Sequence, residues 1–202
     1  MTATDLELID AARDGDRGAM DTLLRRHYDR IFAVCRKVTG SDADAADAAQ
    51  EAMISIVRSL ARFDGRSSFS TWVYRIATNA SLDELRRRRR RPVVGAVESV
   101  GRDVAHEVLD PDAGIRIEIV AERMAIDAAL GQLPEDFRIP IVLRDLAGLD
   151  YAEIAEVLSV PVGTVKSRIA RGRAALATRL STPTDPAPGN RPGIDERPTA
   201  AP

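Results

Sequence analysis

The stretch GTVKSRIARGRAAL, residues 163–176, carries one lysine and three arginines and no acid. It follows LDYAEIAEVLSVPV, in which Asp150 stands where a helix N-cap is favoured and Glu153 stands three residues later. This spacing is typical of a capping box, in which each side chain accepts a hydrogen bond from the other residue's backbone amide. The pattern predicts a short helix over 152–158, a tight connection at SVPVG and a second helix over 164–180, which together make a helix-turn-helix.

The second of these helices has two chemically different faces. Its apolar face is expected to pack on Ile154, Ala155 and Leu158 through Val165, Ile169, Leu176 and Leu180. The opposite face is small and basic, as suits a helix that enters the major groove. It presents Lys166, Ser167, Ala170 and Arg171, with Arg168 and Arg173 at its flanks. A solvated basic face on a core helix is the alternative, but the turn, the cap and the charge pattern together favour DNA binding.

Charge is segregated along the chain, although the formal net charge is only −2. Residues 62–91 hold nine bases and three acids, residues 164–179 hold five bases and no acid, and the segment 92–163 between them is acidic. Local fields of this kind steer polyanions even when the total charge is near zero. The chain therefore has two basic blocks that are candidates for nucleic-acid contact.

The composition also narrows the class of protein. Cys35 is the only cysteine, so no intrachain disulfide is possible, and the acidic N-terminus lacks the features of a signal peptide. No apolar run is long enough to span a bilayer, so we expect a cytoplasmic protein without membrane insertion. There is no glycine-rich phosphate loop and no CxxC pair, and two histidines and one cysteine do not assemble a nucleophile with its base. We expect a binding protein with no catalytic residues, no metal and no cofactor.

The first basic block combines basic and aromatic side chains. Four of the eight aromatic residues of the chain lie in it: Phe63, Phe69, Trp72 and Tyr74. Bases of single-stranded nucleic acid stack on aromatic rings while arginines follow the phosphates, and the run from Arg86 to Arg91 suits a duplex backbone. Core packing is the alternative for Trp72 and Phe69, and a solvated helix end is the alternative for the arginines. Asn79 either bonds locally or reads a base edge.

The acidic stretch SDADAADAAQEAMISIV, residues 41–57, places Asp44, Asp47 and Glu51 on one helical face beside Gln50. Carboxylate triplets can bind a metal ion, but no histidine is near in the sequence, and acids in the first turns of a helix stabilise its dipole. A face that binds arginines of a partner protein is the favoured interpretation.

Hydrophobic periodicity predicts an all-α fold with two small helical domains joined by a flexible linker. The expected boundaries are 1–92 for the first domain, 93–114 for an acidic linker, 115–180 for the second domain and 181–202 for a disordered, proline-rich tail. Helices are expected over 4–15, 17–39, 42–60, from 70 into the arginine run, over 115–130, and from LPED through Pro140, which kinks its helix or lies in the first turn.

One buried stripe is expected in the helix over 17–39, and it consists of Leu24, Tyr28, Ile31, Cys35 and Val38. In the helix over 42–60, Ile54, Val57 and Leu60 are expected to share one face.

Four motifs stand in order along the chain: DAADAAQEAM, FDGRSSFSTWVYRIATNASLDELRRRRRR, LPEDFRIPIVLRDLAGLDYAEIAEVL and VPVGTVKSRIARGRAAL. Together they resemble bacterial RNA polymerase sigma factors of the sigma-70 superfamily, in the extracytoplasmic-function (ECF) group, over about residues 5–180. The resemblance implies a sigma-2 and a sigma-4 domain that bind core RNA polymerase, recognise promoter DNA and start its melting. It also implies an alternative sigma factor for stress or envelope signals, controlled by an anti-sigma factor and monomeric when free of polymerase.

The resemblance assigns roles to the surfaces described above. The acidic face is similar to the one that docks on the clamp helices of the polymerase largest subunit, which implies polymerase contacts at Asp44, Asp47, Gln50 and Glu51. The first basic block is similar to the segment that opens the −10 element and captures a flipped base, with the loop 65–70 lining the pocket; the implied contacts are Phe63, Ser70, Trp72, Arg75, Asn79, Arg86 and Arg87. The helix over 164–180 is similar to the reader of the −35 element; the implied contacts are Thr164, Lys166, Ser167, Arg168, Ala170 and Arg171.

Two other classes of function stay open on the residues alone. One is an autonomous helix-turn-helix regulator whose N-terminal domain senses a signal or dimerises, and the segment from Trp72 to Asn79 and the arginine run speak against it. The other is a structural adaptor, and two separate basic blocks speak against that.

Overall fold

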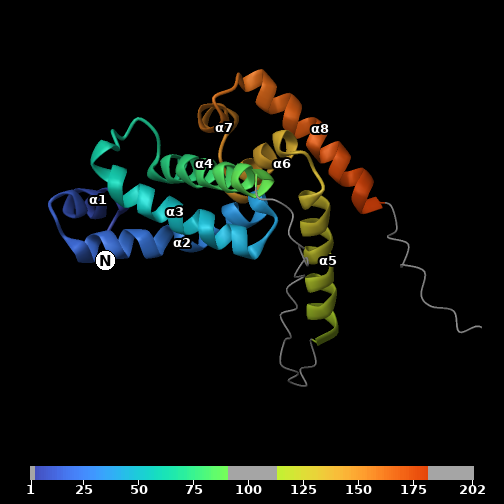
Figure 1. The fold of residues 1–202 in the computed structure, drawn as a ribbon, viewed down its shortest axis with the longest axis horizontal. Helices are drawn as coiled ribbons and strands as arrows, with labels where there is room; N and C mark the ends of the chain where they lie inside the picture. Colours follow the sequence, from blue (N-terminus) through green and yellow to red (C-terminus); the bar gives the residue numbers. More distant parts are fainter. Residues whose placement is uncertain (1–2, 91–112, 182–202) are drawn as a thin grey trace, which may run out of the picture.

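The computed structural model describes residues 3–90 and 113–181, and every regular element in these ranges is a helix (Figure 1). The N-terminal half contains α1 (Asp5–Arg13), α2 (Arg17–Thr39), α3 (Asp42–Ser59), the short turn η1 (Leu60–Arg62) and α4 (Phe69–Arg90). The C-terminal half contains α5 (Ala113–Gly131), α6 (Glu135–Ile141), the π turn η2 (Val142–Leu146), α7 (Tyr151–Leu158) and α8 (Val162–Ser181). The predicted all-α class is confirmed. The predicted linker, except for its last two residues in α5, and the predicted tail, except for Ser181, lie outside the described residues.

Local signals set the helix ends where the sequence predicts them. Thr4 and Glu7 form a capping box at the start of α1, with Thr4 N donating to Glu7 Oε2 at 2.7 Å. Asp150 and Glu153 form a second one at the start of α7. Gly40 ends α2 in the left-handed conformation, with φ of 74°. Each signal depends on residues at most four positions apart, which is why the sequence reveals it.

The buried face of α2 differs from the expected stripe. Ile31, Cys35 and Val38 are buried as predicted, but Leu24 is half-buried and Tyr28 is 43% exposed, so the prediction for Tyr28 is wrong. Helix α2 packs on α1, α3 and α4, and these neighbours cover the side that includes Leu23, His27 and Val34.

The face of α3 toward the core consists mainly of alanines. Its buried residues are Ala45, Ala48, Ala49, Ala52 and Ile56. These small side chains let α3 approach α2 and α4 closely, and they turn the larger residues outward. Ile54 is half-buried and Val57 is 46% exposed, while Leu60 is buried.

Pro140 lies near the end of α6 and not in its first turn. Proline offers no backbone donor, which disturbs the regular ladder of hydrogen bonds. The chain changes to the π turn η2 within two residues, and Ala147 N donates across five residues to Val142 O at 3.1 Å. The proline thus coincides with a change of helix type.

Helix α8 crosses both α7 and α6. Val165 and Ile169 are buried in the same cluster as Ile154, as predicted. Leu176 instead packs on Leu130, Leu133 and Ile141, and Leu180 is 46% exposed, so the prediction that Leu180 packs on α7 is wrong. The axis of α8 diverges from the short α7, which ends at Leu158 and cannot cover the far end of α8 (Figure 1).

The two halves contact each other through α4 with α7 and through α2 with α5, α6 and η2. One apolar cluster contains residues of both halves. Thr71 Oγ1 on α4 donates to Glu153 Oε1 on α7 at 2.6 Å. Arg89 Nη2 lies 2.6 Å from Glu135 Oε1. The structure therefore shows the two halves packed together.

Candidate nucleic-acid interface

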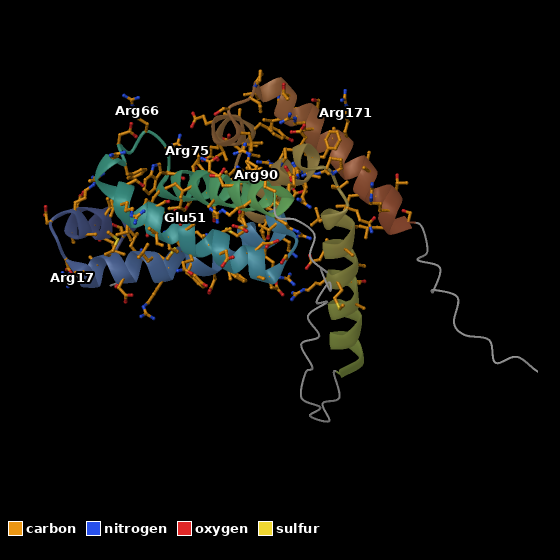
Figure 2. All side chains as sticks on the ribbon, in the orientation of Figure 1. Arg17, Glu51, Arg66, Arg75, Arg90 and Arg171 are labelled. Carbon is orange, nitrogen blue, oxygen red and sulfur yellow. The ribbon has the colours of Figure 1, made fainter. Side chains whose placement is uncertain are left out.

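The first half of α8 presents the side chains that the sequence assigns to the −35 element. Val165 and Ile169 are buried and fix the orientation of the helix. The opposite face exposes Lys166, Ser167, Ala170 and Arg171. Figure 2 shows Arg171 projecting from α8 away from the other helices. These side chains are placed as a helix that enters a groove requires.

Two of the predicted contacts on α8 are less accessible. Thr164 and Arg168 are half-buried, and Arg168 Nη2 lies 3.0 Å from Asp136 Oδ1 at the start of α6. The flanking Arg173 is held by Asp145 at 2.5 Å, and this hydrogen bond raises the pKa of the Arg173 guanidinium. Of the five cationic residues of α8, Arg168 and Arg173 are held by acids, whereas Lys166, Arg171 and Arg179 form no ion pair within the described residues.

Tyr151 is a residue of this surface that the sequence did not reveal. Its ring lies 5.7 Å from Lys166 Nζ and 5.0 Å from Arg144 Cζ. Cations are attracted to the face of an aromatic ring, so Tyr151 gathers two cations at the start of α7. The three residues come from three different elements, and no spacing rule connects them.

Phe63, Phe69 and Trp72 form one aromatic cluster at the base of the loop 64–68. The ring centroids are 5.3 Å apart for Phe63 and Trp72, 5.5 Å for Phe63 and Phe69, and 5.6 Å for Phe69 and Trp72. All three side chains are buried. In this conformation Trp72 and Phe69 pack in the core, as the alternative interpretation of these two residues predicts, and so does the predicted contact Phe63. The three rings lie under the loop 64–68 and support it.

The exposed face of α4 carries the polar members of the predicted −10 surface. Arg75, Asn79 and Arg86 are exposed and follow one another at steps of four and seven residues, so they lie along one side of the helix. Ser70, in the first turn, is half-buried. Arg66 of the preceding loop is exposed as well, and Figure 2 shows Arg66 and Arg75 at the same edge of the bundle.

The start of α4 is fixed by hydrogen bonds that the sequence did not reveal. Ser68 Oγ accepts from Thr71 N at 3.0 Å and lies 2.7 Å from Thr71 Oγ1. Ser68 thus caps the helix, which begins at Phe69, one residue before the predicted start. The same Thr71 hydroxyl reaches Glu153, so the end of the loop is tied to the helix-turn-helix.

The arginine run at the end of α4 is largely held by acids. Arg86 pairs with Asp83 at 2.8 Å, and Arg87 pairs at 2.8 Å with Glu84, which is 2% exposed. Arg88 and Arg89 pair with acids of other helices, namely Asp44 of α3 at 3.1 Å and Glu135 of α6 at 2.6 Å. Much of the positive charge of this segment is therefore bound within the molecule.

The acidic face of α3 is exposed at three of its four predicted positions. Asp47, Gln50 and Glu51 face solvent, and Figure 2 shows Glu51 on the outer side of α3. Asp44 is turned toward Arg88 and is only partly accessible. Next to this face lies an apolar hollow of about 290 Å³, lined by Leu24, Met53, Ile54, Val57 and Arg58. The exposed Val57 and the half-buried Leu24 thus line an apolar hollow beside the acidic face.

The described residues lack the features of two other kinds of site. Within residues 3–90 and 113–181, no three histidine, cysteine or acidic side chains gather closely enough to hold a metal ion. No helix in these ranges is long and apolar enough to cross a membrane.

Comparison with known proteins connects both surfaces to one family. The model of Sigma-70 region 2 matches residues 23–91, which include α4, and the model of Sigma-70 region 4 matches residues 123–176, which include α7 and most of α8. The RNA polymerase sigma-H factor of Pseudomonas aeruginosa is 37% identical over 87% of this chain and 93% of its own length. The ECF RNA polymerase sigma factor SigW of Bacillus subtilis is 36% identical over 85% of this chain and 94% of its own.

Solved structures of sigma factors share the fold. CnrH, in complex with the cytosolic domain of CnrY, is 26% identical, with a TM-score of 0.62 over 87% of this chain and 96% of CnrH. The sigma factor RpoE of Bartonella quintana, in complex with the anti-sigma factor NepR, is 22% identical, with a TM-score of 0.64 over 79% of this chain and 95% of its own. By sequence and by fold, this chain belongs to the sigma-70 family of RNA polymerase sigma factors, in the extracytoplasmic-function group.

Proposed function

We propose that this ECF sigma factor reads the −35 element with α8 and opens the −10 element with α4 and the loop 64–68, while α3 docks on core RNA polymerase. The observation that carries the proposal is the pair of exposed basic surfaces, one in each of the two regions that match the family. The protein is a transcription initiation factor by family. We infer that it acts in the cytoplasm with the polymerase and has no catalytic activity of its own.

At the −35 element, α8 enters the major groove with its first turns. Arg171 has the reach and the forked donors for a guanine edge, and Lys166 and Ser167 reach bases or phosphates. Ala170 lies between them and has a small side chain, which allows the helix backbone to approach the DNA closely. Thr164 contributes near the helix start, and Arg168 does so after it leaves Asp136. Part of the recognition then depends on DNA shape.

At the −10 element, Arg75, Asn79 and Arg86 contact the DNA along the exposed side of α4. The loop 64–68 lies at the start of this side, above the cluster of Phe63, Phe69 and Trp72. A flipped base needs a pocket that offsets the cost of unstacking. The aromatic rings supply a rigid floor for such a pocket, while Ser70 and the loop supply its polar wall. Arg87 contributes mainly through the order that its pair with Glu84 gives to α4.

On core polymerase, α3 offers charge and apolar surface side by side. Asp47, Gln50 and Glu51 are exposed for arginines and other donors of the partner, and the hollow next to them can accept an apolar side chain. Mixed surfaces of this kind give both specificity and affinity. Asp44 supports the face indirectly by holding Arg88.

Reading both elements at once requires the two halves to separate. The −10 and −35 elements are about 25 base pairs apart, or roughly 85 Å along B-form DNA at 3.4 Å per base pair. In this structure, α7 of the helix-turn-helix is in contact with α4. The packed arrangement is therefore that of the factor away from the promoter, and binding to polymerase opens it.

A protein inhibitor is the second partner that we propose. CnrH and RpoE, which share this fold, were solved with CnrY and with the anti-sigma factor NepR. An anti-sigma factor that stabilises the packed arrangement would keep both DNA surfaces from acting together.

We expect the free chain to be a monomer, and sedimentation of the purified protein measures this.

Run-off transcription tests the proposal. Purified chain is mixed with sigma-free core polymerase and fragments of the source genome, and the 5′ ends of the transcripts are sequenced. We expect discrete start sites that need both components, with two shared sequence elements upstream. Asn79→Ala should abolish most of these starts, while Arg25→Gln, an exposed change on α2, should leave them. No starts, together with tight duplex binding by the chain alone, would instead show an autonomous helix-turn-helix regulator.

A further inference from the structure

Helix α1 lies outside the part of the chain that matches the region 2 model, which begins at residue 23. It is nevertheless firmly attached, because Leu8 and Ile9 are buried in the main core. Both of its ends also reach the neighbourhood of the loop 64–68, and α1 contacts the turn η1 that leads into this loop. This placement raises the question of what α1 does for the loop.

The C-terminal end of α1 holds the start of the loop through Arg13. Its guanidinium donates to Leu60 O at 3.3 and 3.4 Å, from Nη2 and Nε, and Nη2 also donates to Phe63 O. Leu60 O also accepts from Phe63 N at 3.1 Å, so the rigid fork of Arg13 adds a second hydrogen bond to this carbonyl and one to Phe63 O. Arg13 therefore fixes the chain where it leaves α3 and enters the loop.

The N-terminal end of α1 supports the other end of the loop through Asp5. The carboxylate lies 2.8 Å from Nε2 of His27, which is buried, and 2.6 Å from Nη1 of Arg26. The His27 ring packs edge-on against Phe69 with centroids 5.1 Å apart. Phe69 is the first residue of α4, so Asp5 and His27 fix the chain where it leaves the loop.

We propose that α1 is a brace that positions the −10 loop, with Arg13 as the main positioning residue. The inference rests on the proposed role of this loop in capturing a base. Phe63 and Phe69 are the two residues that flank the loop. Helix α1 holds Phe63 through the backbone carbonyl that Arg13 contacts, and it holds Phe69 through His27. Loss of the Arg13 contacts lets the start of the loop move relative to its end. The pocket then no longer fits the captured base, while the surfaces proposed to bind the −35 element and polymerase stay unchanged.

The test measures capture of the base and not overall binding. Holoenzyme made with the full chain binds the non-template strand of a promoter found by run-off mapping, and the same strand with an abasic nucleotide at each −10 position in turn. For the unchanged protein we expect one position where removal of the base weakens binding about tenfold, since a stacked or pocketed base contributes on that scale. For Arg13→Gln we expect this ratio to fall to about twofold, with binding to core polymerase and to a −35 duplex unchanged.

Matched variants separate the possible outcomes. Arg25→Gln removes an exposed arginine that pairs with Asp21 on the same helix, and it should keep the tenfold ratio. Arg13→Lys keeps one donor for the two carbonyls and should give an intermediate ratio even if Arg13→Gln does not fold. If Arg13→Gln weakens binding to intact and abasic strands equally, Arg13 has a purely structural role and the inference is overturned. If the unchanged protein shows no loss at any abasic position, the proposed −10 function falls and the inference falls with it.

Discussion

The two helices assigned to promoter DNA use their basic residues differently. On α8, Lys166 and Arg171 are exposed, and neither forms an ion pair with another residue in the described part of the chain. On α4, each arginine from Arg86 to Arg89 is paired with a carboxylate, two on the same helix and two on other helices. The denser run of arginines therefore offers less free charge per residue than the sparser one. The sequence gives the number of basic residues, but only the fold shows how many of them are free of acids and can contact DNA.

The difference also separates two physical roles. In the proposed contact with a base, Arg171 leaves no acid of the described residues, so it exchanges only water. Each arginine from Arg86 to Arg89 must instead exchange a carboxylate for a phosphate, and for Arg88 and Arg89 this exchange also breaks an ion pair that joins α4 to α3 or to α6.

The largest effect is expected where an arginine of α4 holds a buried acid. Arg87→Ala leaves the Glu84 carboxylate, which is 2% exposed, without its ion pair. Because an unpaired buried charge is costly, and Arg87 itself is largely exposed, we expect the free energy of unfolding to fall by about 2 kcal/mol. Urea unfolding measures this. Arg90→Ala is the matched control, since Arg90 is exposed and, among the described residues, donates only to the carbonyl of Arg86, and it should cost less than about 0.5 kcal/mol. If both variants lost the same free energy of unfolding, Arg87 would have no structural role.

The next effect concerns a free cation of α8. Arg171→Ala should weaken binding of the holoenzyme to a −35 duplex about tenfold, without loss of stability, because a bidentate contact to a base contributes about 1–3 kcal/mol. Arg173→Ala should weaken it less, because Arg173 is already held by Asp145. Fluorescence anisotropy at several salt concentrations measures both. If the two variants behave alike, pairing with an acid does not decide which cations reach DNA.

A smaller effect is expected at the contact between the halves. Glu153→Gln keeps the capping box of α7, where glutamine also serves, but weakens the bond from Thr71. Replacing a charge-assisted hydrogen bond with a neutral one costs about 1 kcal/mol, so the separated population should rise about fivefold. Energy transfer between labels at Arg25→Cys and Arg179→Cys reports the separation. Burial raises the pKa of the Cys35 thiol, so it should not take up label. Glu156→Gln, at an exposed site on α7, should change nothing.

The smallest effect on stability is expected for Asp5, which lies on α1 and not on either helix that we propose to contact DNA. Burial of Asp5 raises the pKa of its carboxyl, but the hydrogen bonds from Arg26 and His27 lower it more, so the pKa lies below its usual value of 3.8. A lowered pKa in the folded state means that Asp5 adds stability above about pH 3.8 and that this contribution is lost as the pH falls further. Asp5→Asn should therefore narrow the stability difference between pH 6 and pH 3 by a fraction of 1 kcal/mol. Thermal unfolding across this range measures the difference, and an identical pH profile in the variant would contradict the assignment.

Sequence reasoning succeeded where the cause of a structure is local. The capping boxes at Thr4 and Asp150 and the left-handed Gly40 depend on near neighbours, and the buried side of α8 at Val165 and Ile169 follows helical spacing. It failed where several neighbours compete for one helix, as at Tyr28 and Leu180. It could not foresee the contacts of Arg13 with Phe63, 50 positions away, or of Thr71 with Glu153, 82 positions away. Both contacts depend on how helices are placed in space, which no periodicity encodes.

Glu153 shows how the packed arrangement can open without any loss of secondary structure. One of its carboxylate oxygens accepts from Asp150 N at 2.8 Å within α7, and the other accepts from Thr71 on α4. When α7 leaves α4, only the second bond breaks, and the first turn of α7 stays capped. The helix-turn-helix then travels as a preassembled rigid body, on the microsecond-to-millisecond timescale of domain motions. If the halves open on polymerase as proposed, the helix-turn-helix reaches the promoter already folded and no refolding step is needed.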